Sequence, residues 1–330
     1  MKAWTPLLAL TMGDPAGIGP EIVVKALAVA EVRQLCRPVV IGSLAVIGHA
    51  ADQLHLGMKV RQVDDVSEAR FEPDQVDVYD PSARQPEEFA AGKGSGHAGL
   101  LAVQAAARLA LDGRVDGIVT GPIDRVAVGA SGSRFNGHSE TLAELAGVKD
   151  YASMRLTGKL RVVHVTTHVS LREAIERVRQ ERVLTTIRLA AEGCRRLGIA
   201  EPRLAVAALN PLLDDESDRN NEETQEIIPA VEAARRLGID VEGPLRAETV
   251  FLRASCGEFS AVIAMYHDQG QIPSRMFGFK TAVNTTLGLP FVRTGVEHGT
   301  ALDIAGKGIA DPADMVEAIR VVAQMAQSVR

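Results

Sequence analysis

Short apolar runs alternate with segments of helical spacing along this chain, and this alternation constrains the fold more than any other feature. The runs include Leu7–Met12, Gly117–Thr120, Val162–Thr166 and Ala261–Tyr266, and each ends in turn residues. Between them lie segments rich in Ala, Leu, Glu and Arg, such as Leu184–Leu197. Strands and helices that alternate in this way form parallel sheets, because each helix returns the chain to the edge where the next strand starts. The sequence therefore predicts an α/β protein with mostly parallel sheets covered by helices.

Length and composition exclude several classes of protein. A chain of 330 residues corresponds to two domains or to one large α/β unit. Apolar residues make up 46% and charged residues 24%, which excludes a disordered or fibrous chain. Only 4% of residues are aromatic and the net charge is −6, which argues against a nucleic-acid partner. No stretch approaches the roughly 20 apolar residues that span a bilayer, and Leu7–Met12 is too short for a signal peptide. We therefore expect a cytoplasmic protein that binds small molecules and neither nucleic acid nor membrane.

Residues with useful chemistry follow the predicted strands at the points where the strands end. They are Gly13, Asp14, the segment Gly121-Pro122-Ile123-Asp124, His168, Asn210, His267 and Asp268. Ligands of open α/β sheets collect at the carboxyl ends of the strands. The sequence therefore predicts that these residues share one site.

Two histidines are candidates for metal binding. His168 and His267 each follow a strand, and the Asp268 carboxylate is placed to orient the neighbouring imidazole. Imidazoles at separate strand ends can coordinate zinc or another divalent ion. The spacing alone supplies no third ligand, so solvated histidines remain an alternative. His164 lies deeper in its apolar run and is interpreted as a hydrogen-bonded core residue.

Three further segments carry polar residues that suit an anionic ligand. Arg293 interrupts an apolar strand, which indicates either an anchor for a carboxylate or phosphate or a surface residue of an edge strand. Asn284 occupies a similar strand upstream. Ser139 is placed to cap a helix, with His138 just outside its start, where anions bind.

Two glycine-rich segments could approach a cofactor closely. In the segment from Gly13 to Glu21, glycines and the exposed amides of a helix start could hold an anion, although a plain tight turn explains the same pattern. In the segment from His298 to Gly308, small residues would let a loop wrap around a flat ligand such as adenine. Asp303 could accept a hydrogen bond from a hydroxyl there.

Taken together, several motifs resemble one known family. They are TMGDPAGIGPE, NGHSE, TTHVSLREA, YHDQG, NTTLGLPFVRT and HGTALDIAGKG. In this order they are similar to the 4-hydroxythreonine-4-phosphate dehydrogenase family of pyridoxine and pyridoxal phosphate biosynthesis, over a stretch from about Leu7 to the C-terminus. The last motif also resembles the adenine-side loop of the isocitrate and isopropylmalate dehydrogenase superfamily.

The resemblance implies an architecture. It implies a homodimer whose subunits have two α/β domains, each with helices on both faces of its sheet, and an active site in the cleft between them. We expect residues 1–130 and 285–330 to form one domain that carries much of the cofactor site. We expect residues 131–284 to form the other, with the metal and substrate residues and the dimer contacts.

The resemblance also implies an activity. It implies NAD-dependent oxidation of a phosphorylated 3-hydroxy acid and loss of its β-carboxylate, assisted by a divalent metal, usually zinc, that acts as a Lewis acid. The expected substrates are 4-phosphohydroxy-threonine and 4-phospho-threonate or erythronate. Three alternatives are a dihydrodiol dehydrogenase for an aromatic-acid diol, a phosphate acyltransferase and a non-catalytic ligand-binding homologue.

Roles for single residues follow from the matching motifs. The implied substrate contacts are His138, Ser139, Arg275, Asn284 and Arg293. The implied cofactor contacts are Gly13, His298, Gly299, Thr300, Ala301, Asp303 and Ile304. The expected metal ligands are His168, His267 and Asp215, and the expected catalytic residues are Glu248 and Asp268.

This chain departs from the family pattern at clustered positions. Leu212 stands where the family has a third ligand histidine, so Asp214 or Asp215 is expected to substitute with an oxygen, which would favour magnesium or manganese. Arg275 replaces a lysine, and Glu248 replaces an aspartate. These changes indicate a divergent member, and they leave open a substrate other than the pyridoxine precursor.

Overall fold

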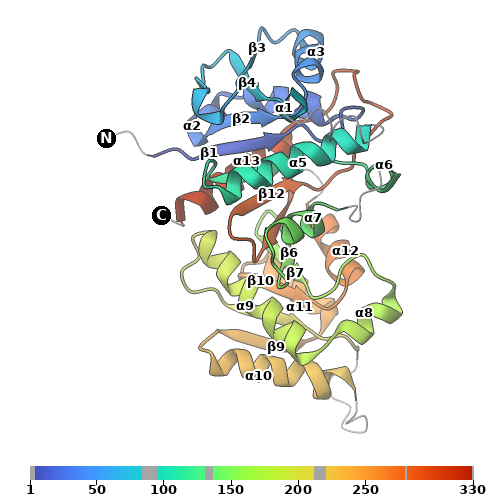
Figure 1. Cartoon of the computed structure of the whole chain (residues 1–330). Coiled ribbons are helices and arrows are strands. Elements are labelled where there is room, and N and C mark those ends of the chain that lie inside the picture. Colours follow the sequence, from blue (N-terminus) through green and yellow to red (C-terminus); the bar gives the residue numbers. More distant parts are fainter. Residues whose placement is uncertain (1–3, 84–94, 131–136, 212–220, 279–280, 329–330) are drawn as a thin grey trace. The chain divides into compact units, whose positions relative to one another are not determined.

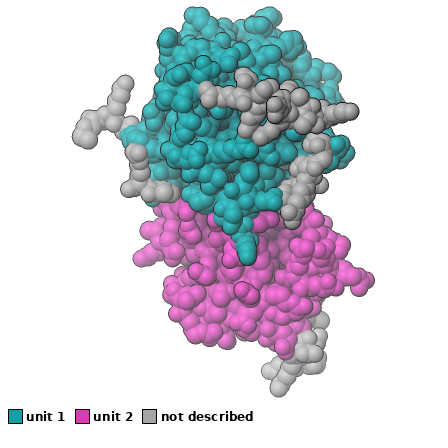
Figure 2. All heavy atoms as spheres, viewed as in Figure 1, with its two compact units in different colours: residues 1–149, 289–330 teal, residues 150–288 magenta. Residues whose placement is uncertain are grey.

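The chain divides into two compact units. The computed structural model describes residues 4–83, 95–130, 137–211, 221–278 and 281–328. Unit 1 comprises Met1–Lys149 and Leu289–Arg330, and unit 2 comprises Asp150–Gly288 (Figure 2). The boundaries predicted at residues 130 and 285 therefore differ from those observed. Helix α7 (His138–Leu145) belongs to unit 1 because it packs on α5 (Ser95–Leu111) of that unit.

Unit 1 is built around a parallel sheet (Figure 1). Its strands are β1 (Leu7–Thr11), β2 (Arg37–Ile41), β3 (Lys59–Gln62), β4 (Gln75–Tyr79), β5 (Gly117–Thr120) and β12 (Val292–Val296). They lie in the order β3-β4-β2-β1-β5-β12, and each described pairing among them is parallel. All four residues of β5 are buried, as expected for a strand covered on both faces.

The strand order of unit 1 reverses between β1 and β5. From β1 the chain proceeds to β2 on one side and later returns to β5 on the other. Such a reversal opens a crevice at the carboxyl ends of the two strands, where α/β sheets bind ligands. Here the Asp14 amide donates to the Pro122 carbonyl at 2.8 Å, and the Gly121 amide donates to the Thr11 carbonyl at 3.1 Å. The two predicted turn motifs therefore meet.

Helices cover this sheet. They are α1 (Gly19–Ala28), α2 (Ala30–Leu35), α3 (Leu44–Leu54), α5, α6 (Arg125–Ala130), α7 and α13 (Ala313–Ser328). Two short 3-10 turns span Val66–Glu68 and Pro81–Ala83. Helix α13 packs on β5 and β12, where Val322 lies so close to Gly117 that an added Cβ would be 2.8 Å from its Cγ2. The N- and C-terminal parts of the chain thus share one core.

Unit 2 has a mixed sheet. Its strands are β6 (Ala152–Thr157), β7 (Leu160–His164), β8 (Leu204–Ala207), β9 (Val241–Leu245), β10 (Ala261–Ala264) and β11 (Ala282–Leu287). They lie in the order β11-β6-β7-β10-β8-β9. Strand β6 is antiparallel to both neighbours, whereas β7, β10, β8 and β9 are parallel. The carboxyl ends of β7, β10 and β8 therefore lie side by side.

The helices of unit 2 connect these strands. They are α8 (Leu171–Arg177), α9 (Gln180–Arg196), a π-helical turn (Glu223–Ile227) that leads into α10 (Ile228–Arg236), α11 (Ala247–Ser255) and α12 (His267–Phe277). One core cluster joins β7, β8 and β10 to α11, with Phe251 and Phe259 as its large side chains. The predicted α/β class with mostly parallel sheets is confirmed.

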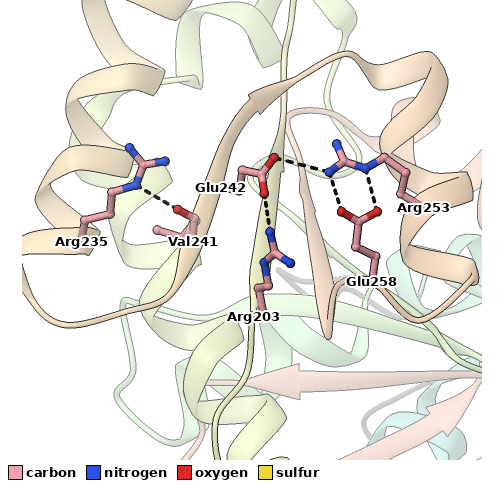
Figure 3. Close-up of polar contacts among 6 residues, drawn as sticks. All are labelled: Arg203, Arg235, Val241, Glu242, Arg253 and Glu258. Carbon is pink, nitrogen blue, oxygen red and sulfur yellow. Dashed lines mark hydrogen bonds and ion pairs between the residues drawn. The ribbon is translucent and has the colours of Figure 1, made fainter.

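Charged side chains cover strand β9 at one end of this sheet (Figure 3). Glu242 accepts from Arg203 Nη2 at 2.8 Å and from Arg253 Nη2 at 3.4 Å. Arg253 also forms a two-bond pair with Glu258, at 2.8 and 2.6 Å. Both guanidinium groups lie over the ring of Phe259, 5.1 and 4.9 Å from its centre.

In the described part of the chain, no helix is both long and apolar enough to cross a bilayer.

Gly13 offers a test of the strand reversal. Its φ is +74°, and an added Cβ would lie 2.5 Å from the Pro122 carbonyl oxygen, whereas Gly57 has φ +68° and open space around it. Both Gly13→Ala and Gly57→Ala should lose about 1–2 kcal/mol from left-handed strain. Gly13→Ala should lose about 1–3 kcal/mol more from the clash, measured as the free energy of unfolding in urea. Equal losses at both positions would contradict this account.

Candidate active site

A buried cation lies at the carboxyl end of the unit 1 sheet. Arg293 sits in β12 opposite Ile118 of β5 and is only 3% exposed. Its Nη2 donates to the Thr120 hydroxyl at 2.5 Å. Gly295 leaves room for this contact, because a Cβ there would lie 2.5 Å from Nη2. Of the two alternatives for Arg293, the structure excludes a surface residue of an edge strand.

Burial shifts the titration of Arg293 without removing its charge. Desolvation lowers the pKa of Arg293 to about 10, and the Glu297 and Glu140 carboxylates act in the opposite direction. A guanidinium with that pKa stays protonated at neutral pH. It is a fixed, desolvated positive charge of the kind that binds carboxylate or phosphate strongly.

His138 lies close to this cation. Helix α7 begins at His138 and its N-cap residue is Gly137, so the prediction that Ser139 caps the helix is wrong. His138 and Ser139 form the first turn instead. Burial, followed by the guanidinium charges of Arg293 and Arg125, holds the pKa of His138 well below its usual value. Its Nε2 is buried and has no hydrogen-bond partner among the described residues. The imidazole is therefore neutral and leaves one nitrogen for a ligand.

The predicted cofactor residues also come together in unit 1. The Ile18 amide donates to the Thr300 carbonyl at 2.9 Å, and a Cβ at Gly17 would lie 2.8 Å from Thr300. The loop from His298 to Gly308 thus packs against the turn that starts at Gly13. Ala301 adopts φ +42°, and the side chain of Asp303 is exposed. His298 Nδ1 lies 2.9 Å from the Gly299 carbonyl oxygen.

The two candidate metal ligands meet in unit 2. The ring centres of His168 and His267 are 5.7 Å apart. His168 has φ +55°, a left-handed conformation that is uncommon for a residue with a Cβ and is found at functional sites. His267 Nδ1 lies 2.6 Å from Asp268 Oδ1. A carboxylate on one ring nitrogen orients the imidazole and leaves the other nitrogen as a ligand atom.

These histidines open onto a cavity of about 280 Å³ in unit 2. It is lined by Thr166, Thr167, His168, Val169, Leu171, Ala174, Tyr266, His267 and Asp268. Within the described ranges, no group of three His, Cys, Asp or Glu side chains is placed to hold a metal ion. Leu212, Asp214 and Asp215 lie outside these ranges, so the third ligand stays a prediction. The pair of imidazoles, with one oriented by a carboxylate, is nevertheless a donor set that suits a divalent transition metal.

His164 lies beneath His267. It is 4% exposed, so the predicted core position is confirmed, and the two ring centres are 6.1 Å apart. Burial, with smaller contributions from His267 and Arg155, lowers the pKa of His164 to about 3. A Cβ at Gly270 would lie 2.5 Å from His164 Nε2. Gly270, one turn after His267 in α12, therefore lets the helix start close to the sheet.

Asn284 lies opposite a buried arginine of the neighbouring strand. In β11, Asn284 faces Arg155 of β6, and its Nδ2 donates to the Ser153 hydroxyl at 2.5 Å. Arg155 is 2% exposed and did not stand out in the sequence, although it interrupts an apolar strand just as Arg293 does. That shared pattern was the signal that could have found it.

Two predicted residues have exposed positions in unit 2. Glu248 is in the first turn of α11, and its carboxylate lies 3.9 Å from Arg246 with 60% of the side chain exposed. Arg275 is exposed near the end of α12. Neither lines the cavity described above. Their catalytic and substrate roles stay predictions.

Comparisons with known proteins agree with this architecture. Residues 34–322 match the family model described as "Pyridoxal phosphate biosynthetic protein PdxA". A D-threonate 4-phosphate dehydrogenase from Cupriavidus necator is 44% identical over 99% of each chain. A 4-hydroxythreonine-4-phosphate dehydrogenase from Desulforapulum autotrophicum is 42% identical over 97% of this chain and 96% of that protein. The crystal structure of a 4-hydroxythreonine-4-phosphate dehydrogenase from Burkholderia phymatum has a TM-score of 0.82, with 40% identity and 98% of both chains covered.

The fold, the strand-end residues and these matches define an oxidoreductase of the dehydrogenase class. The chain belongs to the PdxA family. The predicted family resemblance is confirmed.

Gly270→Ala tests the packing beneath His267. The new methyl group would also lie 2.6 Å from Val162 Cγ1, so we expect a loss of about 1–3 kcal/mol in unfolding free energy. Gly48→Ala, in the open interior of α3, is the matched control and should gain about 0.5–1 kcal/mol. Adding His164→Ala to Gly270→Ala should restore part of the loss. Changes of the same sign at both glycines would refute the close approach.

His138 should make stability depend on pH. Because its pKa is lowered on folding, the unfolded chain binds the proton first as the pH falls below about 6.5. Unfolding free energy should then decrease by up to ~1.4 kcal/mol per pH unit for this one group. His138→Gln should flatten the slope by that amount in urea titrations between pH 6.5 and 5. An unchanged slope would show that the imidazole titrates normally in the fold.

Proposed function

We propose that this chain catalyses the NAD-dependent, metal-assisted oxidation and decarboxylation of a phosphorylated 3-hydroxy acid. The observation that carries the proposal is the desolvated Arg293 cation at the reversal of the unit 1 sheet, next to a neutral His138. The names of the relatives, D-threonate 4-phosphate dehydrogenase and 4-hydroxythreonine-4-phosphate dehydrogenase, support this substrate class.

Residues of unit 1 bind the anionic part of the substrate. Arg293 offers a planar fork of donors to a phosphate or carboxylate, and its Thr120 contact fixes the orientation of that fork. The buried Nε2 of His138 gains a partner when a ligand group reaches it. Ser139, in the first turn of the same helix, adds a hydroxyl at an end where backbone amides favour negative charge.

The same unit holds the cofactor. The turn at Gly13 and the loop of His298, Gly299, Thr300, Ala301, Asp303 and Ile304 are joined by the Ile18–Thr300 hydrogen bond. The exposed Asp303 carboxylate accepts hydrogen bonds from ribose hydroxyls. NAD, when bound, supplies the acceptor for the hydride of the substrate alcohol.

Residues of unit 2 hold the metal. His168 and the Asp268-oriented His267 supply two nitrogen ligands, and the expected third is Asp215. A divalent ion, when bound there, supplies Lewis-acid polarisation of the substrate oxygen. Asp268 acts by holding the ring of His267 in one orientation. Asn284, fixed by Ser153, offers an amide to the substrate, and Arg275 a second cation.

The overall reaction balances with these parts. The hydroxyl-bearing carbon loses a hydride to NAD⁺ and its oxygen loses a proton, which gives a β-keto acid. The carbon–carbon bond to the carboxylate then breaks, carbon dioxide leaves, and a proton replaces it. The product is a phosphorylated ketone.

The test is NADH formation by purified protein with four matched substrates. They are D-threonate 4-phosphate, 4-hydroxythreonine 4-phosphate, unphosphorylated D-threonate and an aromatic-acid dihydrodiol, each assayed with zinc, magnesium or manganese. We expect turnover of a phosphorylated acid only. Arg293→Met should abolish it, while Arg196→Met, which breaks an exposed ion pair in α9, should not.

Each other outcome overturns part of the proposal. Turnover of the dihydrodiol alone would show that the substrate is an aromatic-acid diol and not a phosphorylated acid. Turnover that is unaffected by chelators would show that the reaction needs no divalent metal. Protein that binds NAD but oxidises none of the four would exclude this substrate class.

A further inference from the structure

A lysine of helix α1 is bonded to the end of the proposed cofactor loop. Lys25 lies in the last turn of α1, and its side chain is 18% exposed. Its Nζ donates to Glu21 Oε1 at 2.8 Å, to the Gly308 carbonyl at 2.9 Å and to the Ala310 carbonyl at 2.7 Å. An ammonium group has three protons, so all of them are committed to these contacts.

Glu21 completes the attachment. It is 5% exposed, and its Oε1 also accepts from the Ala310 amide at 2.8 Å. Both backbone groups of Ala310 are therefore held by one ion pair on the helix. Most exposed ion pairs contribute little, but here the loss of one partner would leave a desolvated charge beside the loop.

The same helix holds the other end of the loop. The Ile18 amide, at the N-cap of α1, donates to the Thr300 carbonyl at 2.9 Å. Between the two ends, Gln53 Nε2 of α3 donates to the Gly306 carbonyl at 3.1 Å. The side chains of Leu302 and Ile309 are 56% and 66% exposed. The loop is thus fixed through its backbone, while the side chains of Leu302 and Ile309 face solvent.

Packing does not hold the glycines of this loop. Gly306 and Gly308 have φ of +71° and +69°, and the nearest atoms to an added Cβ are 3.8 Å away in both cases. Glycine has more backbone freedom to lose than any other residue. Hydrogen bonds donated by Lys25 and Gln53, and the one that Glu21 accepts from Ala310, therefore restrict this stretch.

We propose that Lys25 and Glu21 are positioning residues that preorganise the loop from Thr300 to Ala310 for the adenine half of the dinucleotide. This inference rests on the proposed NAD-dependent function. A loop ordered before binding spares the ligand the free-energy cost of ordering it, so the ion pair raises cofactor affinity without touching the cofactor. Neither residue takes part in the chemical step.

Lys25→Met is the direct test, with Lys59→Met as its matched control. Lys59 is 78% exposed and pairs with Asp74 at 3.4 Å in the same unit. By calorimetry, Lys25→Met should weaken NAD and AMP about tenfold, which corresponds to ~1.4 kcal/mol. The Kd of nicotinamide mononucleotide, the KM of the acid substrate and kcat at saturating NAD should not change. Lys25→Arg should bind NAD and AMP more tightly than Lys25→Met does but less tightly than the wild type. Lys59→Met should bind both ligands as the wild type does.

A second variant covers the case in which Lys25→Met fails to fold. Gln53→Ala removes only the Gly306 contact at the surface and should weaken AMP by a smaller factor, with the same selectivity for the adenine half.

The remaining outcomes separate this inference from the proposed function. If the wild type binds NAD, and Lys25→Met and Gln53→Ala both bind AMP as tightly as the wild type does, the inference is wrong and the proposed function stands. If nicotinamide mononucleotide weakens as much as AMP, the effect is a general loss of structure and the inference is wrong. If the wild type binds neither NAD nor AMP, the proposed function fails and the inference fails with it.

Discussion

The hydrogen bond between the Asp14 amide and the Pro122 carbonyl joins the two segments where the strand order of unit 1 reverses. Much of the candidate site depends on this junction. Thr120 ends the strand that leads into it and holds the buried guanidinium of Arg293. The turn that starts there continues into α1, the helix that holds the two ends of the loop from Thr300 to Ala310. A backbone contact thus links the proposed anion-binding residues and the proposed cofactor loop within one unit.

In unit 2, three parallel strands bring the candidate metal-binding side chains together. Because β7, β10 and β8 end side by side, residues more than 90 positions apart in the sequence, such as His168 and His267, come within contact distance. This arrangement requires local strain and close packing. His168 adopts a left-handed conformation, and Gly270 allows α12 to start directly against His164. Both units therefore gather their candidate site residues at the carboxyl ends of parallel strands, a cation in unit 1 and a pair of histidines in unit 2.

The sequence predicts the fold class and the placement of the candidate residues after strand ends, because both follow from short-range patterns. Apolar runs with polar residues at their ends identify strands and their carboxyl edges, and glycines identify the tight turns. The pairing of Thr120 with Arg293 was not predictable, because it depends on which strands are neighbours. The antiparallel pairing of β6 was missed for the same reason, whereas its buried Arg155 carried a sequence signal, a cation inside an apolar strand. Ser139 has the chemistry of a helix cap, but the helix begins one residue earlier, and tertiary packing of α7 on α5 moved the domain boundary.

The ion pairs around Glu242 of β9 affect whether another strand can add to this end of the sheet. A strand at the end of a sheet exposes unpaired amides and carbonyls, and another chain can add to them. Here Glu242 is engaged by Arg203 and Arg253, and Pro244 within the strand has no amide hydrogen to donate. An incoming strand would have to displace ion pairs and would meet a gap in the hydrogen-bonding pattern. Among the described strands, β9 therefore ends the sheet of unit 2, and these features disfavour its pairing with a strand of another chain.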